Sequence, residues 1–206
     1  MMAVGQFVTG SALKRSLLPA LGMMLVAMGL VLSGQGIWIH AKAFVAQILL
    51  ERAFSESIET GAPVKPWNWA DTWPVARIEV PRLEESAIAL KGASGQALAF
   101  GPGHLDNTPM AGERGTAVYA AHRDTHFAFL KNVEENDKIL VTRSDGKTVS
   151  YRVSHMAVVR WDEARIAPDR EGRHLVLATC YPFDAITPGP LRYLVYADMD
   201  TGKSGN

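Results

Sequence analysis

Residues 138–153 read KILVTRSDGKTVSYRV, and this stretch decides the fold class. Two runs rich in β-branched and aromatic residues, Ile139-Leu140-Val141 and Val149 to Val153, flank the pair Asp145-Gly146. An Asp-Gly pair between such runs is typical of a tight turn that joins two antiparallel strands. The stretch therefore predicts a β-hairpin.

Similar runs follow one another from Val75 onward, separated by turn residues. The predicted strands are Ala76–Val80, Ala87–Leu90, Thr116–Ala121, Lys138–Thr142, Val149–Val159, His174–Thr179 and Arg192–Ala197. A short helical turn is expected near residues 127–133. Because the sequence has too few long helices between these runs for a parallel sheet of βαβ units, it predicts an antiparallel, mainly-β barrel.

The amino-terminal part of the chain is apolar. Leu17–Ile39 contains no charged side chain, and a helix of that length, at about 1.5 Å per residue, crosses a hydrocarbon core of about 30 Å. Lys14 and Arg15 precede this segment and Lys42 follows it, which favours a cytoplasmic amino terminus and an external body. A cleaved signal peptide ending near Ala41 is the alternative, but its apolar region would be shorter.

Two further segments connect this apolar stretch to the predicted barrel. Apolar residues from Phe44 to Ile58 recur at helical spacing, which predicts an amphipathic stalk helix. The segment Gly61–Pro74 is rich in Trp and Pro. We interpret it as a linker whose indoles cover the flank of the barrel, and an aromatic belt at the lipid head groups is the alternative.

Length and charge restrict the class of partner. The chain has 206 residues, of which 48% are hydrophobic and 20% charged, so it holds one folded domain with length to spare. Lys plus Arg and Asp plus Glu both number 21, which argues against a nucleic-acid or other polyanionic partner. We find no glycine-rich phosphate loop, because Gly101-Pro102-Gly103 has the character of a turn.

Cys180 is the single cysteine of the chain, so it cannot pair within the chain in an oxidising compartment. It is either a small buried residue or a reactive thiol. Cys180 ends an apolar strand and precedes Tyr181-Pro182, and His122 likewise ends a strand and opens the polar loop Arg123–His126. Strand ends that open into loops present side chains to a substrate from a rigid backbone.

Several stretches together resemble the sortase family. Gly92–Leu105 and Gly115–Phe127 are similar to the first half of a sortase domain, Leu177-Ala178-Thr179-Cys180 resembles the T-L-x-T-C signature, and Leu191–Val195 resembles the strand that carries the catalytic arginine. Val176 departs from the signature, which has Thr there. The resemblance extends from about Trp67 to Ala197, and the Trp-rich segment before the barrel is most like that of Gram-negative, often marine, proteobacterial sortases.

The resemblance implies a closed barrel of about eight strands with short helices, and a cysteine transpeptidase activity. It implies that Cys180 is the nucleophile, that His122 is the general acid and base, and that Arg192 holds the substrate carbonyl or the oxyanion. These roles suit the side chains, because a thiolate beside an imidazolium is a strong nucleophile and a guanidinium presents a planar set of donors. His126 is the rival for the base. A cysteine peptidase that only hydrolyses and a membrane-tethered binding module without activity remain alternatives.

Substrate contacts are expected near the proposed nucleophile. The candidate residues are Thr179, Tyr181, His104, Asp184 and His126, and substrate selection is expected in the loop Tyr181–Pro190 and in Leu83–Leu105. No cofactor is expected, and no spacing typical of a zinc site occurs. Some sortases bind calcium, but the spacing of the acidic residues Glu84, Glu85, Asp106 and Glu113 does not require it.

The resemblance also implies the partners: a protein substrate with a carboxy-terminal LPXTG-like sorting signal, cut between Thr and Gly, and an amine acceptor. The expected domains are a cytoplasmic segment 1–16, a transmembrane signal anchor 17–39, a stalk and linker 40–74, a catalytic barrel 75–199 and a flexible tail 200–206. The expected location is the inner (cytoplasmic) membrane, crossed once, with the barrel on the periplasmic side.

Overall fold

The structure is a computed structural model that describes residues 11–201. The chain divides into two compact units, Met1–Val45 and Ala46–Asn206, and each is described by itself. Most of the predicted amino-terminal segment 1–16 and of the predicted tail 200–206 lies outside the described residues.

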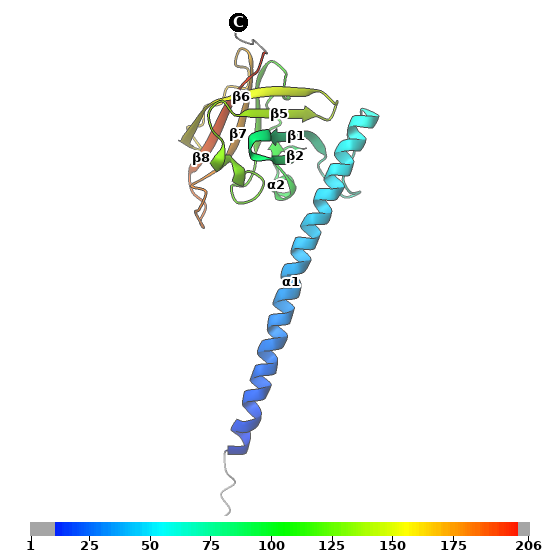
Figure 1. Cartoon of the computed structure of the whole chain (residues 1–206), viewed down its shortest axis with the longest axis vertical. Helices are drawn as coiled ribbons and strands as arrows, with labels where there is room; N and C mark the ends of the chain where they lie inside the picture. The colour runs from blue at the N-terminus through cyan, green and yellow to red at the C-terminus, as the bar shows by residue number, and fades with distance from the viewer. Residues whose placement is uncertain (1–10, 202–206) are drawn as a thin grey trace, which may run out of the picture. The chain divides into compact units, whose positions relative to one another are not determined.

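A single helix, α1 (Ser11–Thr60), contains both the predicted apolar segment and the predicted stalk (Figure 1, blue to cyan). In the part of α1 that precedes Val45, side chains such as Met23, Leu30 and Trp38 are 64–70% exposed. Within Leu21–Thr60, α1 is long enough and apolar enough to cross a membrane. A signal sequence near an amino terminus has the same length and composition. The helix is thus compatible with a single-pass anchor.

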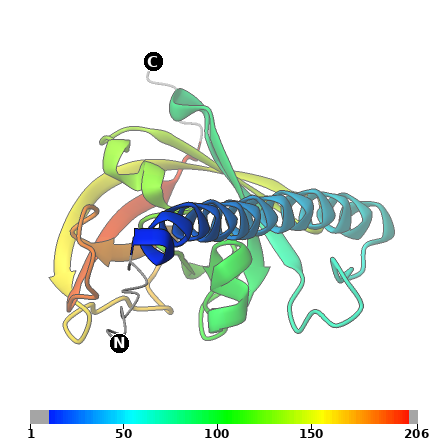
Figure 2. The same cartoon turned by 90° about the horizontal axis from the view of Figure 1, so that it is seen from below.

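The second unit contains a closed barrel of eight strands, which confirms the predicted fold class. The strands are β1 Pro74–Val80, β2 Glu85–Lys91, β3 Gly103–His104, β4 Gly115–Ala120, β5 Lys138–Arg143, β6 Thr148–Arg160, β7 Arg173–Tyr181 and β8 Leu191–Met199. Their order around the barrel is β1-β2-β3-β4-β7-β8-β6-β5. The hairpin predicted from residues 138–153 is β5–β6, and β6 curves strongly around the barrel (yellow in Figure 2).

The prediction of a wholly antiparallel barrel is wrong for two strand pairs. β4 pairs with β7 in parallel, and β2 pairs with β3 in parallel. The chain between β4 and β7 contains the β5–β6 hairpin rather than a crossover helix, so counting helices does not reveal the parallel pair. The β4–β7 pairing matters because it joins the two strands that end near His122 and Cys180.

Alternating residues of the strands fill the barrel. The interior side chains include Ile78, Tyr119, Ile139, Tyr151 and Leu177, each with 0% exposure. The intervening residues face outward, and Val118, Val176 and Leu194 form a second apolar cluster on that outer face. The alternation fixes which side chains of β4, β7 and β8 are accessible to a ligand.

The end of α1 and a short helix, α2 (Gly95–Phe100), form a third apolar cluster on the barrel. Leu50 and Phe54 of α1 are buried there, and Gln47 Nε2 donates a hydrogen bond to the Phe100 carbonyl at 2.9 Å. Residues 46–60 therefore belong to the barrel unit. In the linker, Trp67 packs edge-on against Phe100 at 4.9 Å, as expected for indoles that cover the barrel, whereas Trp69 is 80% exposed.

The sequence predicted the longer elements and one short helix but missed the other short elements. The 3-10 helix η2 (Ala128–Asn132) matches the expected helical turn, whereas α2, β3 and the 3-10 helix η1 (Pro81–Leu83) were not predicted. Gly103, interpreted as part of a turn, starts β3 instead. A Cβ there would lie 2.4 Å from the Gly92 carbonyl oxygen, so glycine permits the close approach of β3 to the preceding segment.

Candidate active site

Three neighbouring strands bring the predicted catalytic residues to one end of the barrel. In the antiparallel β7–β8 pair, Cys180 lies directly opposite Arg192. In the parallel β4–β7 pair, Ala120 lies beside Ala178, and the Ala121 amide continues the ladder to the Ala178 carbonyl at 3.1 Å. His122 and Cys180 each lie two residues further along the chain than the members of this last pair.

The alternation along β7 sets the direction of the Cys180 side chain. Leu175 and Leu177 point into the barrel core, whereas Val176 and Ala178 belong to the outer apolar cluster. Cys180 continues the outer series, and it is half-buried and free. The thiol therefore lies on the outer face of the sheet rather than in the core, where it would be inert.

His122 follows the same alternation along β4. Tyr119 and Ala121 are buried in the barrel core, Val118 is part of the outer cluster, and His122 is exposed. His122 follows β4 by two residues, and Cys180 lies on the adjacent strand β7; neighbouring strands are about 4.8 Å apart.

Arg192 lies on this face as well, because Leu194, two residues along β8, belongs to the outer cluster. Its Nη1 donates hydrogen bonds of 2.9 Å to the carbonyls of Gly189 and Leu191. Within the described part of the chain, its Nε and Nη2 make no hydrogen bond to protein. The two backbone bonds orient the guanidinium and leave donors available for a ligand.

Thr179 has a different environment from the one expected of a substrate contact. Its side chain is only 3% exposed, and its hydroxyl donates a 2.8 Å hydrogen bond to the Ala121 carbonyl. This bond ties the residue before Cys180 to the residue before His122. Thr179 thus aligns the two strand ends and does not present its hydroxyl to the outer face.

His126 is half-buried and lies close to His122. Burial lowers the pKa of His126, a hydrogen bond to the Ala99 carbonyl opposes that effect, and the charge of His122 lowers the pKa further. The lowered pKa disfavours the imidazolium form of His126, which a thiolate partner needs. These properties favour His122 over its rival.

His104 is a buried residue of β3 rather than part of the outer face. Its ring is 2% exposed, packs on Tyr119 at 5.1 Å, and donates from Nε2 to the Pro109 carbonyl at 3.0 Å. Burial lowers the pKa of His104. The packing indicates that His104 stabilises the barrel and does not touch a substrate.

The loop Tyr181–Pro190 joins β7 to β8. Tyr181 packs with Phe183 and Tyr193 in an aromatic cluster, with ring centroids 5.2–6.2 Å apart, and Asp184 is exposed. The carboxylate of Asp184 is therefore accessible to a ligand. Tyr181, by contrast, follows Leu175, Leu177 and Thr179 in the alternation along β7, whose side chains point into the barrel.

Arg123 is a residue of this region that the sequence did not single out. It follows His122 directly, and its Nη2 donates hydrogen bonds to the carbonyls of Ala185 at 2.5 Å and Thr187 at 3.1 Å. It thereby links the loop after β4 to the loop after β7. Its position directly after the expected base, His122, was the feature of the sequence that could have identified it.

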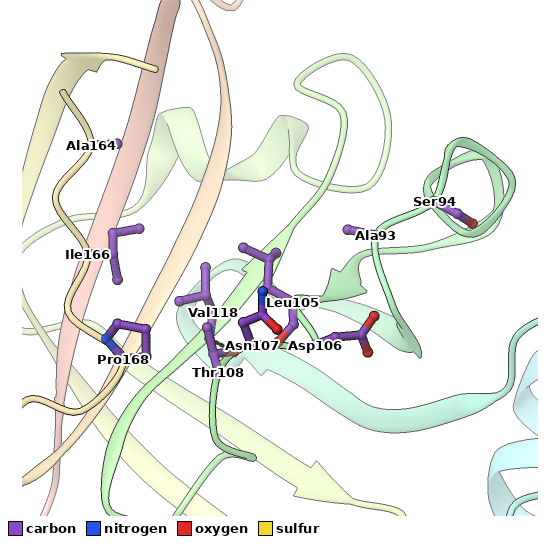
Figure 3. Close-up of a pocket in the computed structure, with 10 residues that line it drawn as sticks. All are labelled: Ala93, Ser94, Leu105, Asp106, Asn107, Thr108, Val118, Ala164, Ile166 and Pro168. Atoms are coloured by element: carbon purple, nitrogen blue, oxygen red, sulfur yellow. Dashed lines mark hydrogen bonds between the residues drawn. The ribbon is translucent and has the colours of Figure 1, made fainter. Parts of the chain in front are cut away.

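A pocket of about 620 Å³ lies on the outer face beside Val118 (Figure 3). In Figure 3, the β6–β7 loop forms one wall and the segments after β2 and β3 form the other; the lining residues are Ala93, Ser94, Leu105, Asp106, Asn107, Thr108, Val118, Ala164, Ile166 and Pro168. The pocket lies on the face of the sheet that carries Cys180, because Val118 belongs to the same outer cluster as Val176 and Ala178 of β7.

Part of this pocket was predicted and part was not. Ala93, Ser94 and Leu105 fall within the segment expected to select substrate, but the contribution of the β6–β7 loop was missed. Gly115 allows that loop to approach β4, because its φ is +113° and a Cβ there would lie 2.2 Å from the Pro168 carbonyl oxygen. The signal was the apolar Ala164, Ile166 and Pro168 in an otherwise charged loop.

The acidic residues considered for calcium lie in other arrangements. Asp106 pairs with Lys91 at 2.6 Å, and Glu113 pairs with Arg143 at 3.4 Å. Among residues 11–201, no three or more His, Cys, Asp or Glu side chains are grouped to hold a metal ion.

Comparisons with known proteins support a family assignment. The family model described as the Sortase domain matches residues 78–200. Sortase D of Bacillus subtilis (strain 168) is 29% identical over 124 residues, which make up 60% of this chain and 63% of that protein. The match thus spans less than two thirds of the length of this curated relative.

Solved structures agree with the family model. Sortase C-1 from Actinomyces oris is 28% identical with a TM-score of 0.54, over 62% of this chain and 74% of that one. The Clostridium perfringens Sortase D5 transpeptidase is 20% identical with a TM-score of 0.60, over 76% of this chain and 98% of that one, which shows a similar fold. Since the family model covers more than half of the sequence and the barrel has the same fold, the chain belongs to the sortase family.

Proposed function

We propose that this protein is a cysteine transpeptidase that cleaves a sorting signal in a partner protein and transfers the acyl group to an amine. Cys180 acts as the nucleophile, His122 as the general acid and base, and Arg192 as the oxyanion donor. The observation that supports the proposal is the strand register, in which Cys180 lies opposite Arg192 and β4, the strand that precedes His122, pairs with β7.

In the first half-reaction, the Cys180 thiolate attacks the carbonyl carbon of the scissile peptide bond. The protonated His122 gives its proton to the nitrogen of the leaving amine as the C–N bond breaks. The products are a thioester on Cys180 and a peptide with a free amino terminus. His122 is then neutral.

In the second half-reaction, an amine attacks the thioester carbon. The amine loses a proton to His122, the C–S bond breaks, and Cys180 leaves as a thiolate. A new amide bond forms, and the thiolate and imidazolium are restored. Every proton transfer in the cycle therefore passes through one imidazole.

Arg192 stabilises the oxyanion that develops on the carbonyl oxygen in both steps. Its Nη1 is occupied by the carbonyls of Gly189 and Leu191, so Nε and Nη2 face the substrate. A donor that is oriented before the reaction stabilises the developing charge without the cost of reorganisation at that moment.

The substrate is a carboxy-terminal LPXTG-like sorting signal, cut between Thr and Gly. Supporting this, the outer-face pocket has apolar lining residues such as Leu105, Val118 and Ile166, which suit an aliphatic side chain upstream of the scissile bond. Asp184 is exposed in the loop Tyr181–Pro190, from which it can contact the peptide.

The protein is anchored in the cytoplasmic membrane by the apolar half of α1, with the barrel on the periplasmic side. The long apolar helix supports an anchor, and the basic residues Lys14 and Arg15 before the apolar segment, against Lys42 after it, support this orientation. A cleaved signal peptide predicts a mature chain that lacks the apolar segment, and the intact mass of the membrane-extracted protein distinguishes the two.

A peptidase that only hydrolyses would use the same residues and differ only in the acceptor. The exposed position of His122 allows either water or an amine to reach the thioester. Product analysis with and without an added amine nucleophile separates the two reactions: a transpeptidase gives the amide of the added amine, and a hydrolase gives the free acid.

The experiment that tests the proposal is intact-mass detection of an acyl adduct after incubation with a sorting-signal peptide. The expected result is an adduct with the mass of the peptide up to Thr, absent in Cys180→Ala and transferred to an added amine. An adduct that persists in Cys180→Ala, or a wild-type protein that forms no adduct with any LPXTG-like peptide, would contradict the proposal.

A further inference from the structure

We propose that Arg123 is a positioning residue that clamps the loop after Cys180 to the loop that begins with His122. The inference rests on the proposed function for its effect on the reaction, but the clamp itself is a structural property of the two loops. It adds to the three proposed catalytic residues a fourth side chain that holds them together.

The first observation is the reach of the side chain. Arg123 Nη2 donates to the carbonyls of Ala185 and Thr187, which lie 62 and 64 residues further along the chain. Both bonds cross from the end of β4 to the middle of the β7–β8 loop. No backbone ladder can make this connection, because both segments have already left their strands.

The second observation is how the β7–β8 loop is held. Alternate carbonyls along it accept hydrogen bonds from two guanidinium groups: Ala185 and Thr187 from Arg123, and Gly189 and Leu191 from Arg192. Three prolines, Pro182, Pro188 and Pro190, remove backbone donors from the loop. Side-chain donors therefore replace the ladder that such a loop cannot form.

Within residues 11–201, the other backbone hydrogen bonds of this loop do not reach the end of β4. The Ala185 amide bonds the Pro182 carbonyl at 3.4 Å, and the Trp161 amide bonds the Pro190 carbonyl at 2.8 Å. Arg123 thus supplies the two bonds between the middle of the loop and the end of β4. Without them, the loop is free to move away from His122 while the barrel strands stay paired.

The chemistry of the side chain fits this role. Nη2 carries two hydrogens, one for each carbonyl, and Nη1 is buried without a hydrogen-bond partner among residues 11–201. A planar fork can serve two carbonyls at once, whereas an ammonium on a flexible stem holds them less rigidly. Lysine should therefore restore the clamp only in part.

The clamp affects the chemical step more than substrate binding. The loop it holds leads into Arg192 and follows Cys180, so its release disturbs the oxyanion donor and the thiol. The outer-face pocket is lined by other segments, including Leu105, Val118 and Ile166. Loss of the clamp should therefore lower kcat more than it raises KM.

The test compares wild type, Arg123→Ala and Arg123→Lys with Arg152→Ala as a matched control. Arg152 also donates to a carbonyl, that of Asn136 at 3.1 Å, but it lies on β6 away from the loop. Hydrogen–deuterium exchange of residues 183–189 measures the clamp, and the kinetics of acyl-adduct formation measure its effect on the reaction.

We expect loop amides to exchange about tenfold faster in Arg123→Ala, and kcat for acylation to fall about tenfold or more, since each bond to a charged donor contributes substantially. Arg123→Lys should be intermediate, and millimolar guanidinium should partly restore Arg123→Ala. Arg152→Ala should match wild type in loop exchange and in kcat.

The outcomes separate the clamp from the proposed function. Unchanged loop exchange in Arg123→Ala overturns the clamp, whether or not the protein is active. Faster exchange with wild-type acylation kinetics overturns the positioning role. A wild type that never acylates contradicts the proposed function, and loop exchange then still decides whether the clamp exists. If Arg123→Ala does not fold, Arg123→Lys answers the same questions.

Discussion

Thr179 illustrates at the scale of a single residue how a side chain beside the nucleophile can serve the site without facing a substrate. The sequence makes it a candidate contact because it precedes Cys180. In the fold it points inward, and its hydroxyl bonds the Ala121 carbonyl at 2.8 Å. The alignment of Cys180 with His122 therefore depends on a bond on the opposite face of the sheet.

This arrangement leads to a prediction for Thr179→Val. Removing the hydroxyl leaves a buried carbonyl unpaired and should lower the free energy of unfolding by about 1 to 3 kcal/mol. It should also slow acylation of Cys180, because the ends of β4 and β7 lose their connection. Denaturant unfolding and adduct kinetics measure the two effects.

Thr72→Val is the matched control for this prediction. Thr72 is equally buried at 3% exposure and donates to the Lys91 carbonyl at 2.7 Å, but it lies in the linker. We expect a similar loss of stability with unchanged acylation kinetics. Equal slowing of acylation in both variants would assign the effect of Thr179 to general destabilisation.

Residue-level reasoning from the sequence could locate the ends of the strands that precede the candidate residues. Cys180 and His122 each close an apolar run and open a polar loop, which a pattern can reveal. It did not predict the burial of His104 or the inward position of Thr179, because the face of a side chain depends on the barrel register. Arg123 was missed because its partners lie more than 60 residues away along the chain.

At the scale of elements, the parallel β4–β7 pair is the feature that builds the site. It sets Ala120 beside Ala178 and so aligns the ends of two strands that run in the same direction. The sequence predicted both strands but not their pairing, since parallel neighbours far apart in sequence leave no turn signal. The two-residue β3 and the six-residue α2 are too short for periodicity to identify.

The guanidinium of Arg82, in η1, anchors the segment just before β5. Arg82 donates from Nε and Nη2 to the Asp137 carboxylate at 2.5 and 2.8 Å, and the Glu134 amide donates to the same carboxylate at 2.8 Å. The hydrogen bond from Arg82 lowers the pKa of Asp137 most strongly, burial opposes it, and the Glu134 amide lowers it further.

The lowered pKa of Asp137 predicts how stability depends on pH. Because the folded pKa lies below the unfolded value, the stabilisation is fully present above the unfolded value of 3.8 and is lost as the pH falls through the folded pKa. In Asp137→Asn, the free energy of unfolding should fall by about 1 to 3 kcal/mol at pH 7 and decline less on acidification. Urea unfolding at pH 7 and below pH 4 checks this, and a parallel decline in both proteins would exclude Asp137 as the cause.

At the scale of the whole molecule, the eight-stranded barrel and the sortase family follow from the fold and the comparisons. The sequence alone predicted the barrel, because alternating strands and a strong hairpin signal are local properties. The outer-face pocket could be only partly predicted, since its walls come from segments before β4 and after β6 that meet only in the folded chain.

The central claim is that His122 and Cys180 lie side by side on the outer face, and cross-linking tests it without relying on activity. In His122→Cys, a short bifunctional methanethiosulfonate should join the new thiol to Cys180 and give a single bridged adduct by intact mass. In Arg114→Cys, an exposed position just before β4 at the far end of that strand from His122, it should give two separate adducts. Two separate adducts in His122→Cys would contradict the account.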